Sequence, residues 1–301
     1  MKSGDPLKKA KNAKLLAYLS LGLVVLAWGI SPIVGKYMLT SYSPGIKRVM
    51  DALFATIALG AIAGKHLIRT DKNTVLFSLL VGLCFSLGLL LEGVGINYTT
   101  PAKSTFFGNV TCITVPIFAA IFAKKLPGPL KVLSGVICLA GFGVIIFGGD
   151  PGSTLPSFAL GDALTLLSGV FYGATVAMTG TWGRSKNTLV VTFFEFLVSI
   201  PMCILYVVLF EKVAFSWSLR DLAIIAASAV VVQALCWLLR NFALRHLDAG
   251  FVAIATSFSM VVSGVVSVLV GMDTFSWALC IGGVICLVAV ILSSLPQHPK
   301  A

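Results

Sequence analysis

Ten long apolar runs constrain the fold of this 301-residue chain more than any other feature of its sequence. Each run supplies about 18–25 mostly apolar residues, which as a helix cross ~30 Å of hydrocarbon. The composition agrees, because 58% of the residues are hydrophobic and only 11% are charged, whereas about 25% are charged in soluble domains. The chain is therefore predicted to be an all-α integral membrane protein with ten transmembrane helices. The predicted spans are 15–37, 44–64, 74–97, 102–123, 129–148, 160–181, 188–210, 219–244, 249–270 and 275–294.

The distribution of the basic residues predicts the orientation in the membrane. With the N-terminus inside, the inner segments hold fifteen of the 22 Lys and Arg residues and the outer segments hold six, while Arg240 falls within a span. The positive-inside rule then places both termini in the cytoplasm, in a multi-pass protein of the cytoplasmic membrane. Nucleic acid is not an expected partner, because the basic residues lie singly or in short groups between apolar runs and form no basic face. We expect the lipid bilayer and a small-molecule substrate as the partners.

The sequence repeats itself once. The pentapeptide Gly-Val-Ile-Cys-Leu occurs at 135–139 and again at 283–287, an offset of 148 residues, and Ala27-Trp28-Gly29 matches Phe171-Tyr172-Gly173 at an offset of 144. Five spans are an odd number, so two copies of a five-helix unit insert with opposite orientation. Such an inverted repeat suits alternating access to a site near the midplane. The predicted parts are a cytoplasmic tail at 1–14, a first five-helix repeat at 15–148, a connecting loop at 149–159, a second repeat at 160–294 and a cytoplasmic tail at 295–301.

These features resemble the drug/metabolite transporter superfamily, in particular the ten-helix EamA-type permeases, over essentially the whole chain. The residues that carry the resemblance are Ala27-Trp28-Gly29, Pro44 with Arg48, Gly95-Ile96-Asn97-Tyr98-Thr99, Pro116, Gly161-Asp162, Phe171-Tyr172-Gly173, Ala243-Leu244-Arg245-His246-Leu247 and Gly282-Gly283. The resemblance implies a permease whose substrate cavity lies beside the positions of Trp28 and Tyr172. One departure is that Lys125 stands where the family often has an acidic residue, whereas Asp273 keeps the second such residue.

Ionisable residues within the predicted spans are the first candidates for the substrate site. Such a group costs about 2.5–3.5 kcal/mol at mid-membrane, so it usually faces a cavity or a partner. Glu92 and Arg240 align at offset 148, and we expect them to flank the substrate, bridged to each other or separated by it; alternatively they lie nearer the surface and are solvated. Glu195 binds a proton or a substrate amine, or forms a salt bridge with a Lys or Arg. Asp51 is expected to pair with Arg48 on the same helix.

Other polar and aromatic side chains extend this candidate site. Gln233, Trp237 and Arg240 follow i, i+4, i+7 and share one helix face, which lines the pathway or makes interhelical hydrogen bonds. Trp28 and Tyr172 are expected to line one central cavity and to stack on a planar or cationic group; the alternative is a packing or interfacial role.

The remaining pair of candidates is Asn109 and Ser257, which align at offset 148. They contact substrate, or they bond backbone carbonyls near Pro116. The glycines of the fifth and tenth spans are expected to allow close helix packing. These glycines are Gly135, Gly141, Gly143, Gly282 and Gly283.

The seven cysteines all fall within apolar runs, with no Cys-x-x-Cys and no nearby His. We therefore expect packing thiols, no disulfide framework, no metal and no cofactor.

The mixed charges of Glu92, Glu195 and Arg240 predict a secondary transporter for a small polar or zwitterionic metabolite, such as an amino acid. An organic cation or drug transporter, or a sugar-phosphate or nucleotide-type transporter, is the alternative within the superfamily. An intramembrane enzyme is the alternative from another class, but it needs a nucleophile with a base, or a metal cluster, at membrane depth. The sequence leaves open the direction of transport, proton-coupled against facilitative transport, and a monomer against a homodimer.

Overall fold

The computed structural model describes residues 6–38, 42–99, 107–148, 160–211, 218–271 and 276–295. Within these ranges the chain forms helices and no strand. The predicted connecting loop at 149–159 lies outside the described residues, as do residues 1–5 and 296–301 of the two predicted tails.

Most helices follow the predicted spans to within a few residues, but the first helix begins at Pro6 instead of 15, and the helix of the fourth span begins at Thr111 instead of 102. The first half contains α1 (Pro6–Met38), α2 (Pro44–Ile68), α3 (Lys72–Gly95), the 3-10 turn η1 (Ile96–Tyr98), α5 (Thr111–Phe122) and α6 (Pro129–Phe147). The second half contains α7 (Leu160–Thr181), the 3-10 turn η2 (Trp182–Ser185), α8 (Thr188–Phe210), α9 (Leu219–Ser228), the π-helix η3 (Ala229–Leu235), α10 (Cys236–His246), α11 (Ala249–Ser257), α12 (Ser259–Leu269) and α13 (Trp277–Ser294).

Two spans that were predicted as uninterrupted helices contain a local irregularity. The span predicted at 219–244 passes through the π-helix η3 between α9 and α10, and the span predicted at 249–270 breaks at Phe258 between α11 and α12. A π-helical segment widens the turn and disturbs the regular backbone ladder, and such segments are frequent at functional sites. Hydropathy alone does not detect either irregularity, because the apolar run continues through both.

Eight helical segments in the described part of the chain are long and apolar enough to cross a membrane. They are Lys11–Ser31, Lys72–Gly95, Pro129–Phe147, Leu160–Ser185, Thr188–Phe210, Leu219–His246, Ala249–Leu269 and Trp277–Ser294. Helix α2 is long enough but carries four charged side chains, Lys47, Arg48, Asp51 and Lys65, and α5 is a shorter apolar helix. The outer surface is apolar, with exposed leucines along one side of α1, which suits contact with hydrocarbon.

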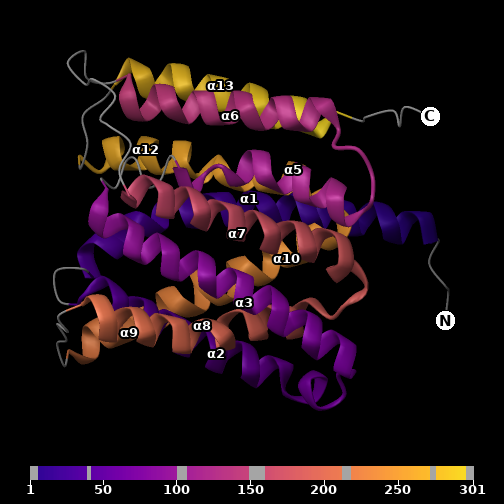
Figure 1. The fold of residues 1–301 in the computed structure, drawn as a ribbon, viewed down its shortest axis with the longest axis vertical. Helices are drawn as coiled ribbons and strands as arrows, with labels where there is room; N and C mark the ends of the chain where they lie inside the picture. Colours follow the sequence, from indigo (N-terminus) through magenta and orange to yellow (C-terminus); the bar gives the residue numbers. More distant parts are fainter. Residues whose placement is uncertain are drawn as a thin grey trace.

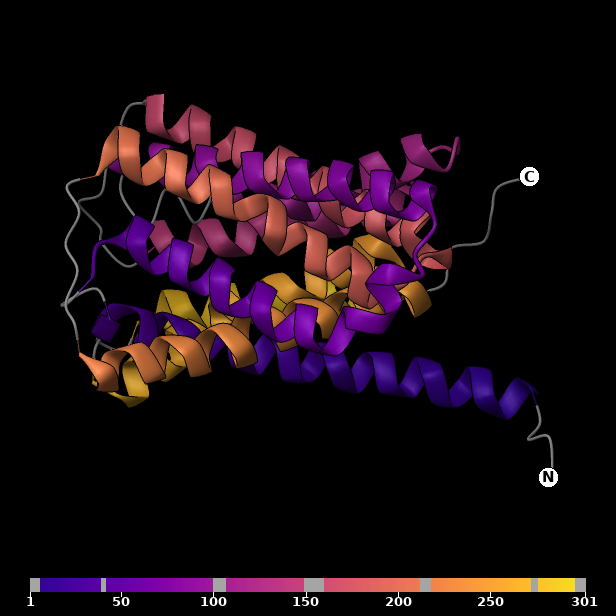
Figure 2. The same ribbon diagram turned by 90° about the horizontal axis from the view of Figure 1, so that it is seen from below.

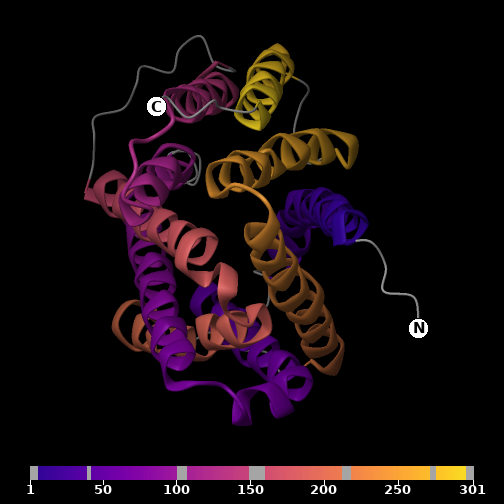
Figure 3. The same cartoon turned by 90° about the vertical axis from the view of Figure 1, so that its right-hand side faces the viewer.

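Helices in corresponding places of the two halves make corresponding contacts. Helix α3 packs on α7 as α10 packs on α1, and α5 packs on α7 as α12 packs on α1. Helix α2 packs on its own counterpart α8, and α6 packs on α13 at one edge of the bundle (Figure 3). Helix α1 begins, and α13 ends, at the same end of the bundle (Figure 1), and the first turns of α1 project beyond the other helices there (Figure 2). Exchanging the halves therefore preserves the packing pattern, as an internal repeat predicts.

Glycines bring α6 and α13 into backbone contact. A Cβ atom at Gly282 would lie 2.5 Å from the carbonyl oxygen of Gly141, and one at Gly141 would lie 2.9 Å from the carbonyl oxygen of Gly282. A Cβ at Gly135 would overlap the carbonyl oxygen of Cys112 on α5. These distances are too short for any side chain, so the predicted role of these three glycines in close helix packing is confirmed.

Gly282→Ala should lower the free energy of unfolding by about 1–3 kcal/mol, because the added methyl group forces α6 and α13 apart. Thermal unfolding in detergent, followed with a thiol-reactive fluorophore, would measure this, since Cys112, Cys138 and Cys286 are buried. Gly64→Ala is the matched control, because a Cβ there meets nothing within 4 Å, and alanine favours the helix by about 1 kcal/mol. Equal free energies of unfolding for Gly282→Ala and Gly64→Ala would contradict the close contact between α6 and α13.

Candidate functional site

One polar cluster joins the start of α2, the end of α3 and the middle of α7. We call Arg48, Glu92 and Tyr172 the α2–α3 cluster. Arg48 Nη2 lies 3.6 Å from Glu92 Oε2, and the Tyr172 hydroxyl donates to the same oxygen at 2.9 Å. Arg48 Nη1 also donates to the carbonyl oxygen of Leu89 at 3.1 Å. The two charged side chains remain 29% and 37% exposed, so this ion pair is accessible.

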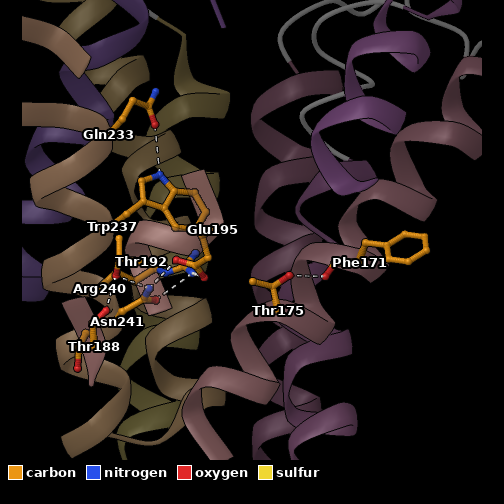
Figure 4. A network of polar contacts seen from close by, with 9 residues as sticks. All are labelled: Phe171, Thr175, Thr188, Thr192, Glu195, Gln233, Trp237, Arg240 and Asn241. Atoms are coloured by element: carbon orange, nitrogen blue, oxygen red, sulfur yellow. Dashed lines mark hydrogen bonds and ion pairs between the residues drawn. The ribbon is translucent and has the colours of Figure 1, made fainter. Parts of the chain in front are cut away.

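A second cluster joins α8 to α10, and its polar and charged side chains are buried. We call Thr192, Glu195, Trp237, Arg240 and Asn241 the α8–α10 cluster (Figure 4). Asn241 Nδ2 donates to Glu195 Oε2 at 2.7 Å and lies 3.0 Å from Thr192 Oγ1, while Arg240 Nη2 donates to Asn241 Oδ1 at 3.2 Å. Arg240 Nη2 lies 3.9 Å from Glu195 Oε1, with the two side chains 6% and 0% exposed. Buried charges need this pairing, because desolvation of either one alone is costly.

The Glu195–Arg240 ion pair is not closed by a direct hydrogen bond. Glu195 Oε1 and Arg240 Nε are buried and have no hydrogen-bond partner among the described residues. Most buried polar side-chain atoms in proteins do have such a partner. The carboxylate oxygen can therefore accept a hydrogen bond from a ligand, and the guanidinium nitrogen can donate one.

The predicted face of the eighth span is confirmed in its local contacts. The Arg240 guanidinium lies 3.8 Å above the centroid of the Trp237 ring, and Trp237 Nε1 donates to Gln233 Oε1 at 3.2 Å. Whether this face lines the pathway remains a prediction. A cation over an indole ring is stabilised by the ring quadrupole, so Trp237 helps to hold the buried guanidinium.

Aromatic rings connect the two clusters. Phe85 lies 4.7 Å from Trp237 and 6.0 Å from Tyr172, measured between ring centroids, and Trp28 lies 5.4 Å from Trp237. Trp28 Nε1 donates to the carbonyl oxygen of Val232, at 3.2 Å, within the π-helix η3. Trp28 and Tyr172 thus stand at the two ends of a row of touching rings. The central cavity predicted between them remains a prediction.

The predicted bridge between Glu92 and Arg240 is wrong, because each residue forms an ion pair with another residue; that the two flank the substrate, separated by it, remains a prediction. Glu92 pairs with Arg48, and Arg240 pairs with Glu195. For Glu195 the expected salt bridge with a basic residue is confirmed. Sequence analysis did not include Arg48 in the site. The internal repeat could have indicated it, because Arg48 aligns with the candidate Glu195 at an offset of 147 residues.

Asp51 does not pair with Arg48 as expected. Its carboxylate accepts from Lys47 Nζ at 2.6 Å, from one helical turn away. Arg48 instead reaches across to α3, where the absence of a side chain at Gly93 leaves room for the guanidinium: a Cβ there would lie 3.1 Å from Nη1. Residues of the α8–α10 cluster that sequence analysis also missed are Thr192 and Asn241.

The two aligned polar residues of the fourth and ninth spans are placed as follows. Ser257 Oγ donates to the carbonyl oxygen of Ala253 at 2.9 Å and accepts from Cys112 Sγ at 3.1 Å. Ser257 thus bonds a backbone carbonyl, but one of its own helix and not one near Pro116, and its contact with substrate remains a prediction. Asn109 lies half-buried in the turn before α5, and its contact with substrate remains a prediction.

A pocket of about 230 Å³ lies at one end of the bundle, away from both clusters. Its lining includes Tyr18, Lys131, Asp248 and Phe251, and Lys131 Nζ lies 2.5 Å from Asp248 Oδ2. None of the predicted site residues lines it. We assign the candidate site to the two clusters because each holds an ion pair that joins two helices, and the α8–α10 cluster adds buried polar atoms that have no partner among the described residues.

The clusters are related by the internal repeat with the charges exchanged. Arg48 corresponds to Glu195 and Glu92 to Arg240, at offsets of 147 and 148. Tyr172 corresponds, at an offset of 144, to Trp28, whose ring packs on Trp237 of the α8–α10 cluster. Helix α2 begins and α3 ends at one end of the bundle, whereas α8 begins and α10 ends at the opposite end (Figure 1). The α2–α3 cluster therefore lies toward one end of the bundle, and the α8–α10 cluster toward the other.

Comparison with known proteins gives consistent results. The model of the EamA-like transporter family matches residues 15–147 and, a second time, residues 159–295. An uncharacterized transporter of Archaeoglobus fulgidus is 26% identical over 287 residues, which cover 94% of this chain and 87% of the archaeal protein. A crystal structure of a protein with 15% sequence identity aligns with a TM-score of 0.78 and covers 94% of this chain and 96% of its own. At that identity the structural likeness shows the fold alone.

Proposed function

Because this chain belongs to the EamA-like transporter family, we propose that it is a secondary, alternating-access transporter of a small polar or zwitterionic metabolite, such as an amino acid. It is a multi-pass membrane protein. The observation that carries the proposed substrate class is the composition of the two clusters, each of which holds one carboxylate and one guanidinium beside aromatic rings. A zwitterion offers one group of each sign to such a pair, as charge complementarity requires.

The charge content of the clusters favours this class over the alternatives in the superfamily. A sugar phosphate or nucleotide carries several negative charges and needs several cations, but each cluster offers one guanidinium next to one carboxylate. An organic cation would use Glu92 or Glu195 but would leave Arg48 and Arg240 without a partner. The family and the archaeal relative point to a transporter rather than to an enzyme.

We extend the proposal to the topology. Helices α2 and α5 complete a set of ten spans, arranged as inverted halves at 15–148 and 160–294. Two observations support this: the family model matches twice, and the packing pattern is preserved when the halves are exchanged. The excess of basic residues in the inner segments favours cytoplasmic termini. A C-terminal epitope tag should bind antibody only after the cells are permeabilised; binding in intact cells would contradict the orientation.

Exchange across a membrane tests the proposed function directly. Purified protein would first be screened by thermal shift against amino acids, amines, nucleobases and sugar phosphates, and then reconstituted in liposomes loaded with the compounds that bind. We expect counterflow of labelled amino acids into protein-containing vesicles but not into empty vesicles. Exchange of sugar phosphates or amines alone would contradict the zwitterionic class, and the same assay with a pH gradient would show whether transport is coupled to protons.

A further inference from the structure

The two clusters have opposite polarity in equivalent positions. In the α2–α3 cluster the cation lies on α2 and the anion on α3, whereas in the α8–α10 cluster the anion lies on α8 and the cation on α10. Had the repeat preserved the sign of each charge, the second cluster would have an arginine on α8 and a glutamate on α10. The exchange of both signs together keeps an ion pair in each half.

We propose that the clusters are two successive binding stations for the same zwitterion. Its carboxylate binds Arg48 and then Arg240, and its ammonium group binds Glu92 and then Glu195. This inference rests on the proposed function and deepens it, because it assigns a separate contact to each end of the substrate. The α8–α10 cluster already has unpartnered atoms for both contacts, Glu195 Oε1 and Arg240 Nε.

The reversed polarity has a geometric consequence for the substrate. A two-fold axis in the membrane plane reverses the component of any vector along the membrane normal. The vector that matters here runs from the cation to the anion of each station. Because the two charges have also exchanged places between the repeats, the component of this vector along the membrane normal is reversed a second time. The two stations therefore present the same polarity along the normal, so a zwitterion passes from one to the other without turning over. Stations with unexchanged charges would require the substrate to rotate its dipole inside the protein, in a medium of low dielectric constant where such a rotation is costly.

The structure holds the two stations in different states. Arg48 and Glu92 are 29% and 37% exposed, while Arg240 and Glu195 are 6% and 0% exposed. A repeat whose halves exchange conformation in the transport cycle exchanges these exposures as well. In the opposite state the α8–α10 station is open and the Arg48–Glu92 pair is buried.

Charge-swapped variants separate this role from that of structural ion pairs. Arg48→Glu with Glu92→Arg, and Glu195→Arg with Arg240→Glu, each keep a salt bridge but reverse one station. In counterflow with a labelled mixture of the twenty L-amino acids, we expect each double variant to exchange at least tenfold more slowly than the parent. The quadruple variant reverses both stations, so it should exchange at least tenfold faster than either double variant.

The control is the charge swap Lys47→Glu with Asp51→Lys, which reverses an ion pair within α2 that belongs to neither cluster. Its exchange rate should stay within about twofold of the parent rate, with all rates normalised to folded, inserted protein. Parent-like exchange by either double variant overturns the two-station proposal, and so does a folded quadruple variant that is as slow as the double variants. If the quadruple variant does not insert into the membrane, the exchange rates of the two double variants still test the two-station proposal.

The same assay distinguishes failure of this inference from failure of the proposed function. Exchange of amines or sugar phosphates but not of amino acids by the parent protein would contradict the proposal of two zwitterion-binding stations, while the protein would still be a transporter. Absence of exchange for every compound in the screen would contradict the proposed function itself.

Discussion

Arg240→Gln is expected to lower the free energy of unfolding by about 3–5 kcal/mol, because it leaves the Glu195 carboxylate buried without its ion-pair partner. Glu195 is fully buried and, among the described residues, would keep only the hydrogen bond from Asn241. The glutamine would also remove the cation that lies over the Trp237 ring. Unfolding in detergent, followed by the reaction of buried cysteines with a thiol-reactive fluorophore, would measure the loss.

Two control variants show whether the loss comes from the unpaired charge. Combining Arg240→Gln with Glu195→Gln removes both charges, so the double variant should recover most of the lost stability. Arg48→Gln removes the cation of the partly exposed α2–α3 pair, where solvent can reach the remaining carboxylate, and should cost about 0–1 kcal/mol. Equal losses for Arg240→Gln and Arg48→Gln would contradict the difference in burial between the two clusters.

Glu92→Gln is expected to slow transport by at least about 30-fold while changing stability little. The proposed contact of Glu92 with the substrate ammonium group is charge-assisted, and removing one partner of such a contact costs about 2–5 kcal/mol, where each 1.4 kcal/mol is a factor of about ten. The glutamine keeps an oxygen that can accept from the Tyr172 hydroxyl, so the substitution isolates the effect of charge. Initial exchange rates in proteoliposomes, normalised to inserted protein, would measure the decrease.

Glu211→Gln is the matched control for this transport prediction. Glu211 directly follows α8 as its C-cap, and its Oε1 accepts a hydrogen bond from the backbone nitrogen of Gly45 at 2.7 Å, so it is a carboxylate outside both clusters. Its variant should transport within about twofold of the parent. A parent-like rate for Glu92→Gln would exclude Glu92 from the substrate site, and equal decreases in the two variants would indicate a general effect of removing a carboxylate.

Much of the fold was predictable from the sequence because hydrocarbon imposes a single local rule on the chain. Each crossing must satisfy its own backbone hydrogen bonds and cover them with apolar side chains, so hydropathy alone located α3, α6, α8 and α13 to within a few residues. The repeated pentapeptide also predicted which helices correspond. Close packing of α6 and α13 was predictable from their glycines, because only small residues allow backbones to approach so closely, whereas the structure showed that the two helices pack on each other.

The tertiary structure alone decided which side chains meet. Hydropathy and the offset between the two repeats could identify Glu92 and Arg240 as candidates for the substrate site. The ion-pair partner of each depends on which neighbouring helix its long side chain reaches. Arg48 forms an ion pair with Glu92 on α3, while Lys47, one residue earlier, forms an ion pair with Asp51. The two cations have the same charge and lie on the same turn of α2, so the sequence alone does not determine which of them pairs with Asp51. Only the packing of the helices shows that Thr192 and Asn241 belong to the site, because an ordinary polar residue gains its role from the buried charge beside it. The sequence by itself thus determined where most of the apolar helices lie and which of them carry ionisable residues, and packing between helices determined how those charges are paired.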